Sequence, residues 1–454
     1  MRPTDIAALI DDRPEDGAFR VDRRVFTEQE IFDLEMAHIF EATWVFVGLE
    51  SQLPRPHDFL TTAIGRRPLI VMRDREGALG CFYNSCSHKG ARICRLGSGN
   101  KKLHVCPYHA WSFDSAGACR AIKHEDKGAY APAFGDMDHD LTHVARFETY
   151  KGFMFASLSA DVPPLAEHLG EAAAFLDCAA DQSPHGVELI PGAVRFTYGG
   201  NWKIQLENCS DPYHFTSAHT SLLRILDKRH EEQKEGATVS VWDEDRPWQE
   251  GAEGVTSGTF SFKNGHVLNW NIMNISPTLP LYERREELLE RFGPDKRAWM
   301  FNMRNLTIFP NLQIAENASS QLRVLRPIAP GRTEMLTYCF GPIGESAAAR
   351  RQRIRQYEDF FNPSGLATPD DTTIYEDCQA GHNAGTGWLQ GYSRGLAATE
   401  QGENPMAAPI GVTPQAGVMG GPELCDETCY HSYYRAWRDL LMAGLERGAA
   451  ETSS

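Results

Sequence analysis

Residues 86–109 read CSHKGARICRLGSGNKKLHVCPYH, and no other part of the chain carries as much structural information. The stretch opens with Cys86 and His88 and closes with Cys106 and His109, so each end supplies one thiolate and one imidazole. A Rieske [2Fe–2S] cluster needs two Cys on one iron and two His on the other. The basic, glycine-rich segment between the two pairs lets two loops reach one cluster and brings backbone N–H groups near its sulfurs. The stretch therefore predicts a Rieske-type centre.

A structural Cys₂His₂ zinc site uses the same four ligands and is the main alternative. Zinc sites usually place both cysteines in one short segment and both histidines in another. Here the order along the chain is Cys, His, Cys, His, which favours the iron–sulfur cluster. Visible absorption separates the two hypotheses, because zinc is colourless.

The composition is that of a globular protein with two or three domains: 454 residues, 42% hydrophobic and 23% charged. A net charge of −16 disfavours nucleic acid as a partner, because it repels phosphate at long range. Residues 1–24 are polar and acidic, and no run approaches the roughly 18 apolar residues of a membrane span. We expect a cytoplasmic protein without a membrane segment. The eleven scattered cysteines predict reduced thiols apart from the cluster ligands.

Three regions follow from the patterning of the chain. Residues 1–44 include a predicted helix and are expected to pack on the larger domain. Short β segments at 58–83 and 152–158 predict a small β domain over residues 45–162, which Pro163 and Pro164 terminate. Residues 163–454 then combine helical stretches such as 165–180 with β runs at 306–314, 321–328 and 334–340, which predicts a larger α+β domain.

A second metal site is predicted around Asp211, His214 and His219. On a regular helix Asp211 and His214 would share a face, whereas His214 and His219 would point roughly 140° apart. A π-bulge or a helix end between the two histidines would bring both imidazoles to one ion. Two His and one carboxylate form the facial triad of non-haem Fe(II) oxygenases, which leaves positions open for O₂.

The carboxylate of this triad has a candidate in Asp371, far along the chain. In the stretch Thr368-Pro369-Asp370-Asp371, Thr368 would be the N-cap of a helix, with Pro369 at N1 and Asp371 at N3. A capping-box carboxylate at N3 explains Asp371 without any metal. From the residues alone, the capping role and the ligand role stay equally open.

With both motifs identified, the chain resembles the large (α) subunit of Rieske non-haem iron aromatic-ring-hydroxylating oxygenases, in the benzoate, anthranilate and halobenzoate branch. The resemblance implies an α+β fold in which a small all-β Rieske domain precedes a catalytic domain with a helix-covered antiparallel sheet (helix-grip, START-like). It also implies His214, His219 and Asp371 as ligands of a mononuclear Fe(II). The residues that carry the resemblance are 84–90 (NSCSHKG), 106–111 (CPYHAW), 144–148 (VARFE), 181–184 (DQSP) and 353–381.

The family further places Asp211 between the two metals, hydrogen-bonded to His214 and to His109 of a neighbouring subunit in a trimer. A carboxylate that accepts N–H bonds from two metal-bound imidazoles holds both rings in place. The resemblance implies an α₃ assembly, or an α₃β₃ assembly with a small β subunit.

The implied activity is that of a terminal oxygenase, which hydroxylates an aromatic carboxylate (benzoate-, anthranilate- or salicylate-like) with O₂ to a cis-diol or a catechol. Electrons would come from NADH through a separate reductase, with or without a ferredoxin, because no Gly-x-Gly-x-x-Gly follows a strand in this chain. Two alternatives are a salicylate-type ring monohydroxylase and a Rieske electron carrier without oxygenase activity.

Recognition of an anionic substrate has to come from local donors, because the net charge of −16 repels it at long range. Asn305, Asn311, Gln313 and Arg323 lie in the predicted β segments where a pocket could form. From the sequence, each of them is equally well explained as a structural polar group.

Overall fold

The computed structural model describes residues 1–127, 130–234, 254–317, 319–385, 387, 389–421 and 424–452. The chain forms two compact units, one of residues Phe40–Leu165 and one of Met1–Ile39 together with Ala166–Ser454. The N-terminal segment thus belongs to the larger unit. No helix in the described ranges has the length and apolar character that crossing a bilayer requires.

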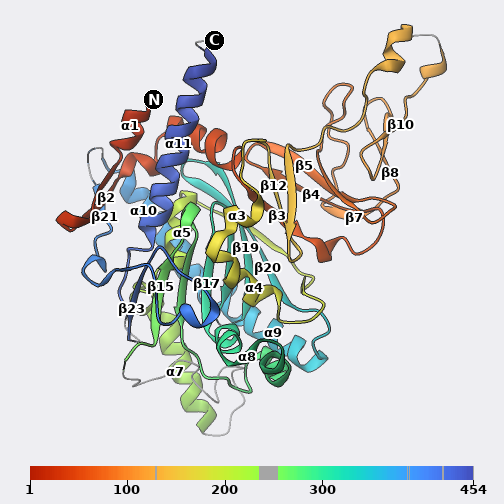
Figure 1. Ribbon diagram of the computed structural model, residues 1–454. Helices are drawn as coiled ribbons and strands as arrows, with labels where there is room; N and C mark the ends of the chain where they lie inside the picture. The colour runs from red at the N-terminus through yellow and green to blue at the C-terminus, as the bar shows by residue number, and fades with distance from the viewer. Residues whose placement is uncertain are drawn as a thin grey trace. The chain divides into compact units, whose positions relative to one another are not determined.

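The smaller unit is built from three antiparallel sheets, coloured orange to yellow in Figure 1. The predicted β segments at 58–83 and 152–158 are confirmed, and the turn at residues 74–77 joins two of their strands. The sheets have the strand orders β6-β5-β4-β7, β10-β9-β8 and β11-β12-β3. Their strands are β3 (Val45–Leu49), β4 (Asp58–Ile64), β5 (Arg67–Arg73), β6 (Leu79–Tyr83), β7 (Ser98–Asn100), β8 (Leu103–Val105), β9 (Ser112–Asp114), β10 (Cys119–Ala121), β11 (Arg146–Tyr150) and β12 (Phe153–Ser157).

The larger unit contains a long antiparallel sheet with the order β13-β20-β19-β18-β17-β16-β15-β23-β22, in which β14 also pairs with β20. The single strand predicted at 306–314 is wrong, because Pro310 lies in a turn that divides it into β17 and β18. The strands are β13 (Val187–Leu189), β14 (Val194–Tyr198), β15 (Ser257–Ser261), β16 (Val267–Asn271), β17 (Met303–Ile308), β18 (Leu312–Glu316), β19 (Ser320–Ala329), β20 (Arg332–Pro342), β22 (Glu400–Gln401) and β23 (Ala416–Gly420).

Helices cover this sheet, so the predicted α+β class with a helix-covered antiparallel sheet is confirmed (Figure 1). A separate small sheet, β1-β2-β21, consists of Ile10–Arg13, Ala18–Asp22 and Leu389–Gly391. The helices of the larger unit are α1 (Pro3–Ala7), α2 (Gln29–Glu35), α3 (Leu165–Leu169), α4 (Ala173–Ala180), α5 (Trp202–Ser210), α6 (Phe215–Ala218), α7 (Thr220–Lys234), α8 (Arg285–Phe301), α9 (Ala347–Phe360), α10 (Thr368–His382) and α11 (Tyr430–Thr452).

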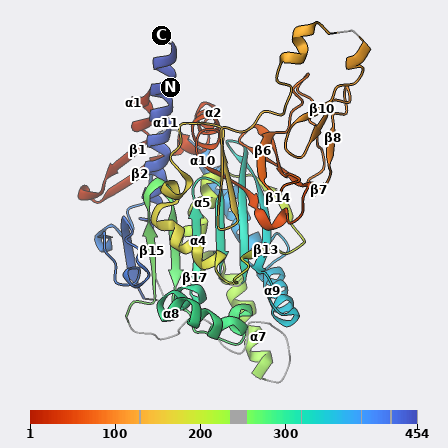
Figure 2. The ribbon, with the colours of Figure 1, turned by 45° about the vertical axis from the view of Figure 1, so that its right-hand side comes forward.

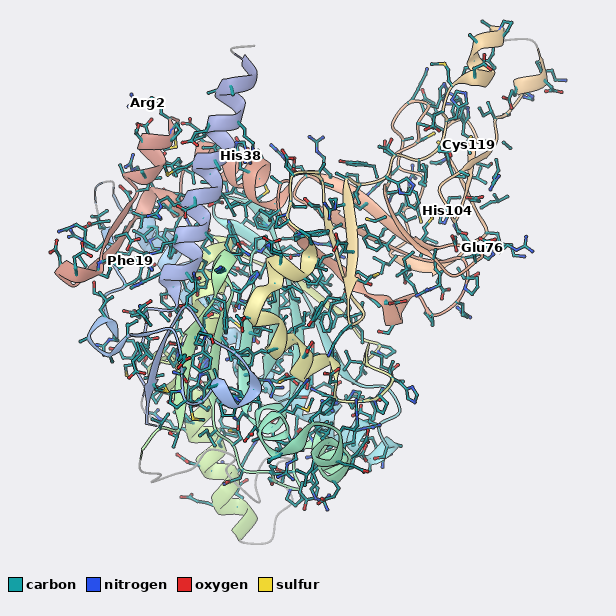
Figure 3. The ribbon with its side chains drawn as sticks, in the orientation of Figure 1. Arg2, Phe19, His38, Glu76, His104 and Cys119 are labelled. Carbon is teal, nitrogen blue, oxygen red and sulfur yellow. The ribbon has the colours of Figure 1, made fainter. Side chains whose placement is uncertain are left out.

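The C-terminal helix α11 ties the N-terminal segment to the larger unit. It runs beside α1 in both ribbon views (Figures 1 and 2). His38 lies against the same helix (Figure 3), and a Cβ atom at Gly444 would come 2.3 Å from Cγ of His38. A glycine is therefore required at this point of α11 for the two segments to pack.

Helix α5 lies on the inner face of the sheet, against β16, β17 and β19. It begins at Asn201, whose side chain accepts a hydrogen bond from the backbone N–H of Lys203. The backbone N–H of Asn201 in turn donates to Oε1 of Gln379 in α10, over 2.8 Å. These bonds fix the start of α5 relative to α10, the two helices that carry or precede the residues of the second predicted metal site.

Candidate metal centres

The two loops of the predicted Rieske centre have the same backbone conformation. In each loop the cysteine N–H donates to the carbonyl five residues ahead, over 2.9 Å for Cys86 and 2.8 Å for Cys106. The residue four positions ahead donates back to the cysteine carbonyl, from Gly90 over 2.8 Å and from Ala110 over 3.0 Å. Both of these residues have positive φ angles, 72° and 59°. The loops are thus two copies of one ligand-presenting turn.

The loops bring like ligands together. Cys86 and Cys106 are both buried, and their thiols are in hydrogen-bond contact. Burial raises the pKa of the Cys86 thiol, while the backbone N–H groups of His88 and the next residue point toward its sulfur and act in the opposite direction. The His88 and His109 rings lie 4.6 Å apart between centroids. Nδ1 of His88 is buried and has no hydrogen-bond partner among the described residues, so it is free to bind a metal.

The geometry of the four ligands distinguishes a cluster from a zinc ion. A tetrahedral zinc would hold all four ligand atoms within about 4 Å of one another. In the described part of the chain, only His214, His219 and Asp371 form a set of three or more metal-binding groups within 4.8 Å of one another. The Rieske residues instead form a thiol pair and an imidazole pair, as a two-iron cluster requires.

The second predicted site is built where α5 ends. Asp211 follows the last residue of α5 with extended backbone angles (φ −87°, ψ 107°), so it shares no helix face with His214 and that prediction is wrong. Pro212 follows it, and a proline does not continue a helix. His214 and His219 flank the single turn of α6 as its N-cap and C-cap. A helix end therefore lies between them, and their ring centroids are 5.2 Å apart.

Asp371 comes to the two histidines from α10. Its Oδ1 lies 3.2 Å from Nε2 of His219 and 3.7 Å from Nε2 of His214. The N-cap of α10 is Ala367 rather than Thr368, because the backbone N–H groups of Asp370 and Asp371 both donate to the Ala367 carbonyl. Asp371 is thus beyond N3 and caps nothing, so the capping-box hypothesis is wrong.

Two further residues support the site, and sequence reasoning missed both. Oδ2 of Asp370 lies 3.3 Å from Nδ1 of His219 and accepts a hydrogen bond from it. The side-chain amide of Asn208, in the last turn of α5, donates to Oδ1 of Asp371 over 3.0 Å and lies 3.3 Å from Nε2 of His214. The only signal for them in the sequence is position, because Asp370 directly precedes Asp371 and Asn208 lies three residues before Asp211.

The electrostatics of the triad are those of a cation site. In the protonated ring of His219, Nδ1–H donates to the carboxylate of Asp370 and Nε2–H donates to the carboxylate of Asp371. Burial disfavours the charged form of both groups, but their mutual hydrogen bond outweighs it, so the pKa of His219 is raised and that of Asp371 is lowered. A shared proton thus neutralises the contact, and a metal ion is the natural replacement for it. Two imidazoles and one carboxylate fit non-haem Fe(II).

Asp211 lies on the other side of His214. Its Oδ1 accepts the backbone N–H groups of Tyr213 (2.6 Å) and His214 (3.3 Å). Its Oδ2 is 3.3 Å from Nδ1 of His214, which is ion-pair distance, yet this Nδ1 has no hydrogen bond within the described ranges. The backbone N–H groups thus hold the carboxylate of Asp211 where it could accept a hydrogen bond from Nδ1 of His214.

Comparison with known proteins identifies two domains in the chain. Residues 43–147 match the model of the Rieske [2Fe-2S] domain, and residues 181–443 match that of the ring hydroxylating alpha subunit (catalytic domain). The chain is 38% identical to toluate 1,2-dioxygenase subunit alpha of Pseudomonas putida, over 97% of this chain and 95% of that protein. It is 37% identical to the 2-halobenzoate 1,2-dioxygenase large subunit of Burkholderia cepacia (97% and 93%) and to the anthranilate 1,2-dioxygenase large subunit of Acinetobacter baylyi (98% and 94%).

Solved structures show the same fold. A naphthalene 1,2-dioxygenase mutant bound to phenanthrene superposes with a TM-score of 0.82 at 24% identity, over 99% of this chain and 98% of that one. Naphthalene 1,2-dioxygenase from Rhodococcus sp. gives a TM-score of 0.78 at 23% identity, over 93% and 94%. The chain belongs to the α subunits of the Rieske ring-hydroxylating oxygenases. It is accordingly an oxidoreductase that contains a Rieske [2Fe–2S] domain, and the predicted resemblance is confirmed.

Proposed function

We propose that this chain is a terminal oxygenase component that hydroxylates an aromatic carboxylate with O₂, using electrons from NADH that arrive through a separate reductase, with or without a ferredoxin. The observation that carries the proposal is the convergence of His214, His219 and Asp371 within 4.8 Å in a chain that also holds a Rieske domain. An electron carrier needs only the cluster, so the triad favours the oxygenase.

The substrate class is supported by the relatives. Toluate, 2-halobenzoate and anthranilate are all rings that bear a carboxylate, and the three dioxygenase subunits named for them are 37–38% identical to this chain over 97–98% of its length. Subunits named for biphenyl and benzene dioxygenases are 29–30% identical and cover 84% of it. The greater similarity to the acid-named subunits favours an aromatic acid.

The residues divide the work between the two centres. Cys86, His88, Cys106 and His109 would hold the [2Fe–2S] cluster, and His214, His219 and Asp371 would hold the mononuclear iron. Together the two metals supply the stepwise reduction of O₂ and the insertion of oxygen into the ring.

The surrounding side chains of the chain orient the iron ligands. Asp370 fixes the ring of His219 through Nδ1, and the amide of Asn208 fixes the carboxylate of Asp371. His219 is only 3% exposed, which keeps bulk water away from its side of the site.

Asp211 is proposed to connect the two kinds of centre between subunits. In this proposal its carboxylate accepts an N–H bond from His214 and one from His109 of a neighbouring subunit, in an α₃ trimer or an α₃β₃ hexamer with a small β subunit. The 3.3 Å contact between Asp211 and His214 supports the first half of this link. Dependence on NADH places the protein in the cytoplasm in this proposal.

The substitution His214→Ala tests the oxygenase. We expect the visible spectrum of the cluster to be retained and the oxygen uptake that depends on an aromatic acid to be abolished. His185→Ala, an exposed histidine of the same unit, is the matched control and should change neither. Undiminished uptake in His214→Ala would favour the electron carrier. Product analysis with benzoate and salicylate then separates a cis-diol or catechol from a monohydroxylated ring.

A further inference from the structure

One polar row crosses the inner face of the sheet beside the iron site. Thr307 of β17 is directly opposite Gln313 of β18, Gln313 is opposite Arg323 of β19, and Arg323 is opposite Thr337 of β20. Cys209 of α5, two residues before Asp211, contacts both Thr307 and Arg323. The row therefore lies under the end of α5, from which the chain enters the metal-binding segment.

Most of this row is occupied by structural hydrogen bonds. The amide of Gln313 donates to the Gln205 carbonyl (3.2 Å) and to Oγ1 of Thr307 (3.3 Å), and it accepts from the Gln205 amide (3.1 Å). The hydroxyl of Thr337 donates to Oδ1 of Asn362 over 2.8 Å. The row contains two of the residues predicted to line a pocket, Gln313 and Arg323. The amide of Gln313 is fully used by its hydrogen bonds, whereas the guanidinium of Arg323 still has N–H donors for a ligand.

Arg323 is a buried cation that pairs with no carboxylate of the described residues. The residue is 8% exposed, its Nε donates to the side-chain oxygen of Gln321, and its guanidinium lies 5.6 Å from the ring centroid of Phe361. No carboxylate of the described residues lies within ion-pair distance of it. A buried charge without a counter-ion is costly, because desolvation is not repaid by a neighbouring opposite charge.

Other buried arginines of the same unit are paired with a glutamate. Arg304, 1% exposed, pairs with Glu316, and Arg353, 2% exposed, pairs with Glu345. Arg323 also lies close to the triad, because it contacts Cys209, and the side chain of the preceding residue, Asn208, donates to Asp371. Within the described residues, Arg323 is thus near the triad and lacks the anion that Arg304 and Arg353 have.

We propose that Arg323 binds the carboxylate of the aromatic acid and thereby holds the ring beside the mononuclear iron. A guanidinium matches a carboxylate with two parallel N–H donors, which fixes the orientation of the ring as well as its affinity. The inference rests on the proposed function and specifies the subsite that selects an acid. It also explains how an anion binds to a protein of charge −16, because the attraction is local.

The experiment compares equilibrium binding of benzoate and of benzamide, its neutral analogue, to purified wild-type protein and to Arg323→Gln and Arg323→Lys, by calorimetry. Wild type is expected to prefer benzoate. In Arg323→Gln, benzoate binding should weaken about 30-fold or more while benzamide binding changes little, because one partner of a buried charge pair has been removed. Arg323→Lys keeps the positive charge but lacks the two parallel N–H donors of the guanidinium, so its benzoate affinity should lie between those of wild type and Arg323→Gln.

Arg326→Gln is the matched control. Arg326 is in the same strand, on the opposite face of the sheet, and pairs with Glu334 over 3.4 Å. It should leave benzoate affinity unchanged. The visible cluster spectrum and the melting temperature of each variant establish that it is folded.

The outcomes separate the two proposals. Unaltered benzoate affinity in folded Arg323→Gln, or equal loss of benzoate and benzamide binding, would overturn the role of Arg323 while leaving the oxygenase intact. Wild-type protein that neither binds nor oxidises any aromatic acid, yet oxidises a neutral ring, would instead overturn the proposed substrate class.

Discussion

The ammonium group of Lys203 lies 2.5 Å from Oε1 of Glu35, and both side chains are buried. The same carboxylate accepts hydrogen bonds from Nε1 of Trp202 (2.8 Å) and of Trp437 (2.7 Å). One glutamate of the N-terminal helix α2 thus joins α5 to α11. Because α5 leads directly into the predicted metal-binding segment, this buried pair fixes the helix from which that segment starts.

We expect Lys203→Ala to lower the free energy of unfolding by about 3–5 kcal/mol, because it leaves the Glu35 charge buried without a counter-ion. Chemical denaturation followed by tryptophan fluorescence measures the change. The double variant Glu35→Gln/Lys203→Met should recover part of the loss. Lys228→Ala, which removes an exposed lysine from α7, should change stability by less than about 0.5 kcal/mol. A loss in Lys203→Ala no larger than in this control would contradict the prediction.

The substitution Asp371→Asn is expected to remove the mononuclear iron and leave the cluster in place, since the site then lacks its anionic ligand. Asp370→Asn should weaken iron binding about 10- to 100-fold, because it loosens the ring of His219. The measurement is metal and sulfide analysis together with the visible spectrum. Asp377→Asn, an exposed residue of the same helix, should retain the wild-type iron content. Full iron occupancy in Asp371→Asn would rule out this carboxylate as a ligand.

Because the turns at Gly90 and Ala110 are equivalent, replacing the glycine by alanine and replacing the alanine by glycine should have opposite effects on the stability of the smaller unit. Gly90→Ala places a side chain at φ 72° and should destabilise the smaller unit by about 1 kcal/mol, although its Cβ would meet nothing closer than Oγ of Ser85 at 3.7 Å. Ala110→Gly relieves the same strain at φ 59° and should stabilise the unit by a similar amount. Thermal loss of the visible circular dichroism of the cluster reports both changes, and shifts of the same sign would show that the turns differ.

The pair formed by Asp12 and Arg435 predicts a pH dependence. Burial raises the pKa of Asp12, but its hydrogen bonds to Arg435 (2.7 and 2.6 Å) outweigh this, so its pKa in the folded protein is below the ordinary value. A depressed carboxyl pKa contributes stability above the unfolded pKa of about 4, and this contribution is lost as the pH falls through the folded pKa.

Asp12→Asn should therefore cost about 1 kcal/mol at neutral pH and progressively less below about pH 4. Urea denaturation of both proteins across that range measures the difference. Asp16→Asn, at an exposed aspartate of the same N-terminal segment, serves as the control. A difference that stays constant down to about pH 2 would assign the effect to packing rather than to charge.

Much of the smaller unit could be predicted because its signals are local. The ligand order in residues 86–109 specifies the chemistry, and the strands at 58–83 alternate with turn residues over short distances. Hydrogen bonds within a few residues determine such turns, and tertiary contacts change them little.

One error came from a local signal that the strand prediction passed over: the run at 306–314 contains Pro310, and this proline occupies a turn between two strands. The other errors fell where tertiary contacts compete with local rules. Thr368 satisfies the N-cap preference, but α10 begins one position earlier, with Asp371 turned toward His219. Helical spacing suggested a shared face for Asp211 and His214, whereas α5 ends before them.

The sequence by itself indicated two metal centres, because the order of the ligands and the chemistry of thiolate and imidazole side chains are read locally, but it left the role of Asp371 open. Strand pairing and burial bring together residues that are remote in sequence, and they determined the surroundings of the predicted ligands and of Arg323. They placed Asp370 and Asn208 around the predicted iron ligands and left Arg323 buried with no carboxylate partner in the part of the chain that the structure describes. Whether a charged side chain is balanced is a property of its three-dimensional surroundings, and no local pattern of residues records it.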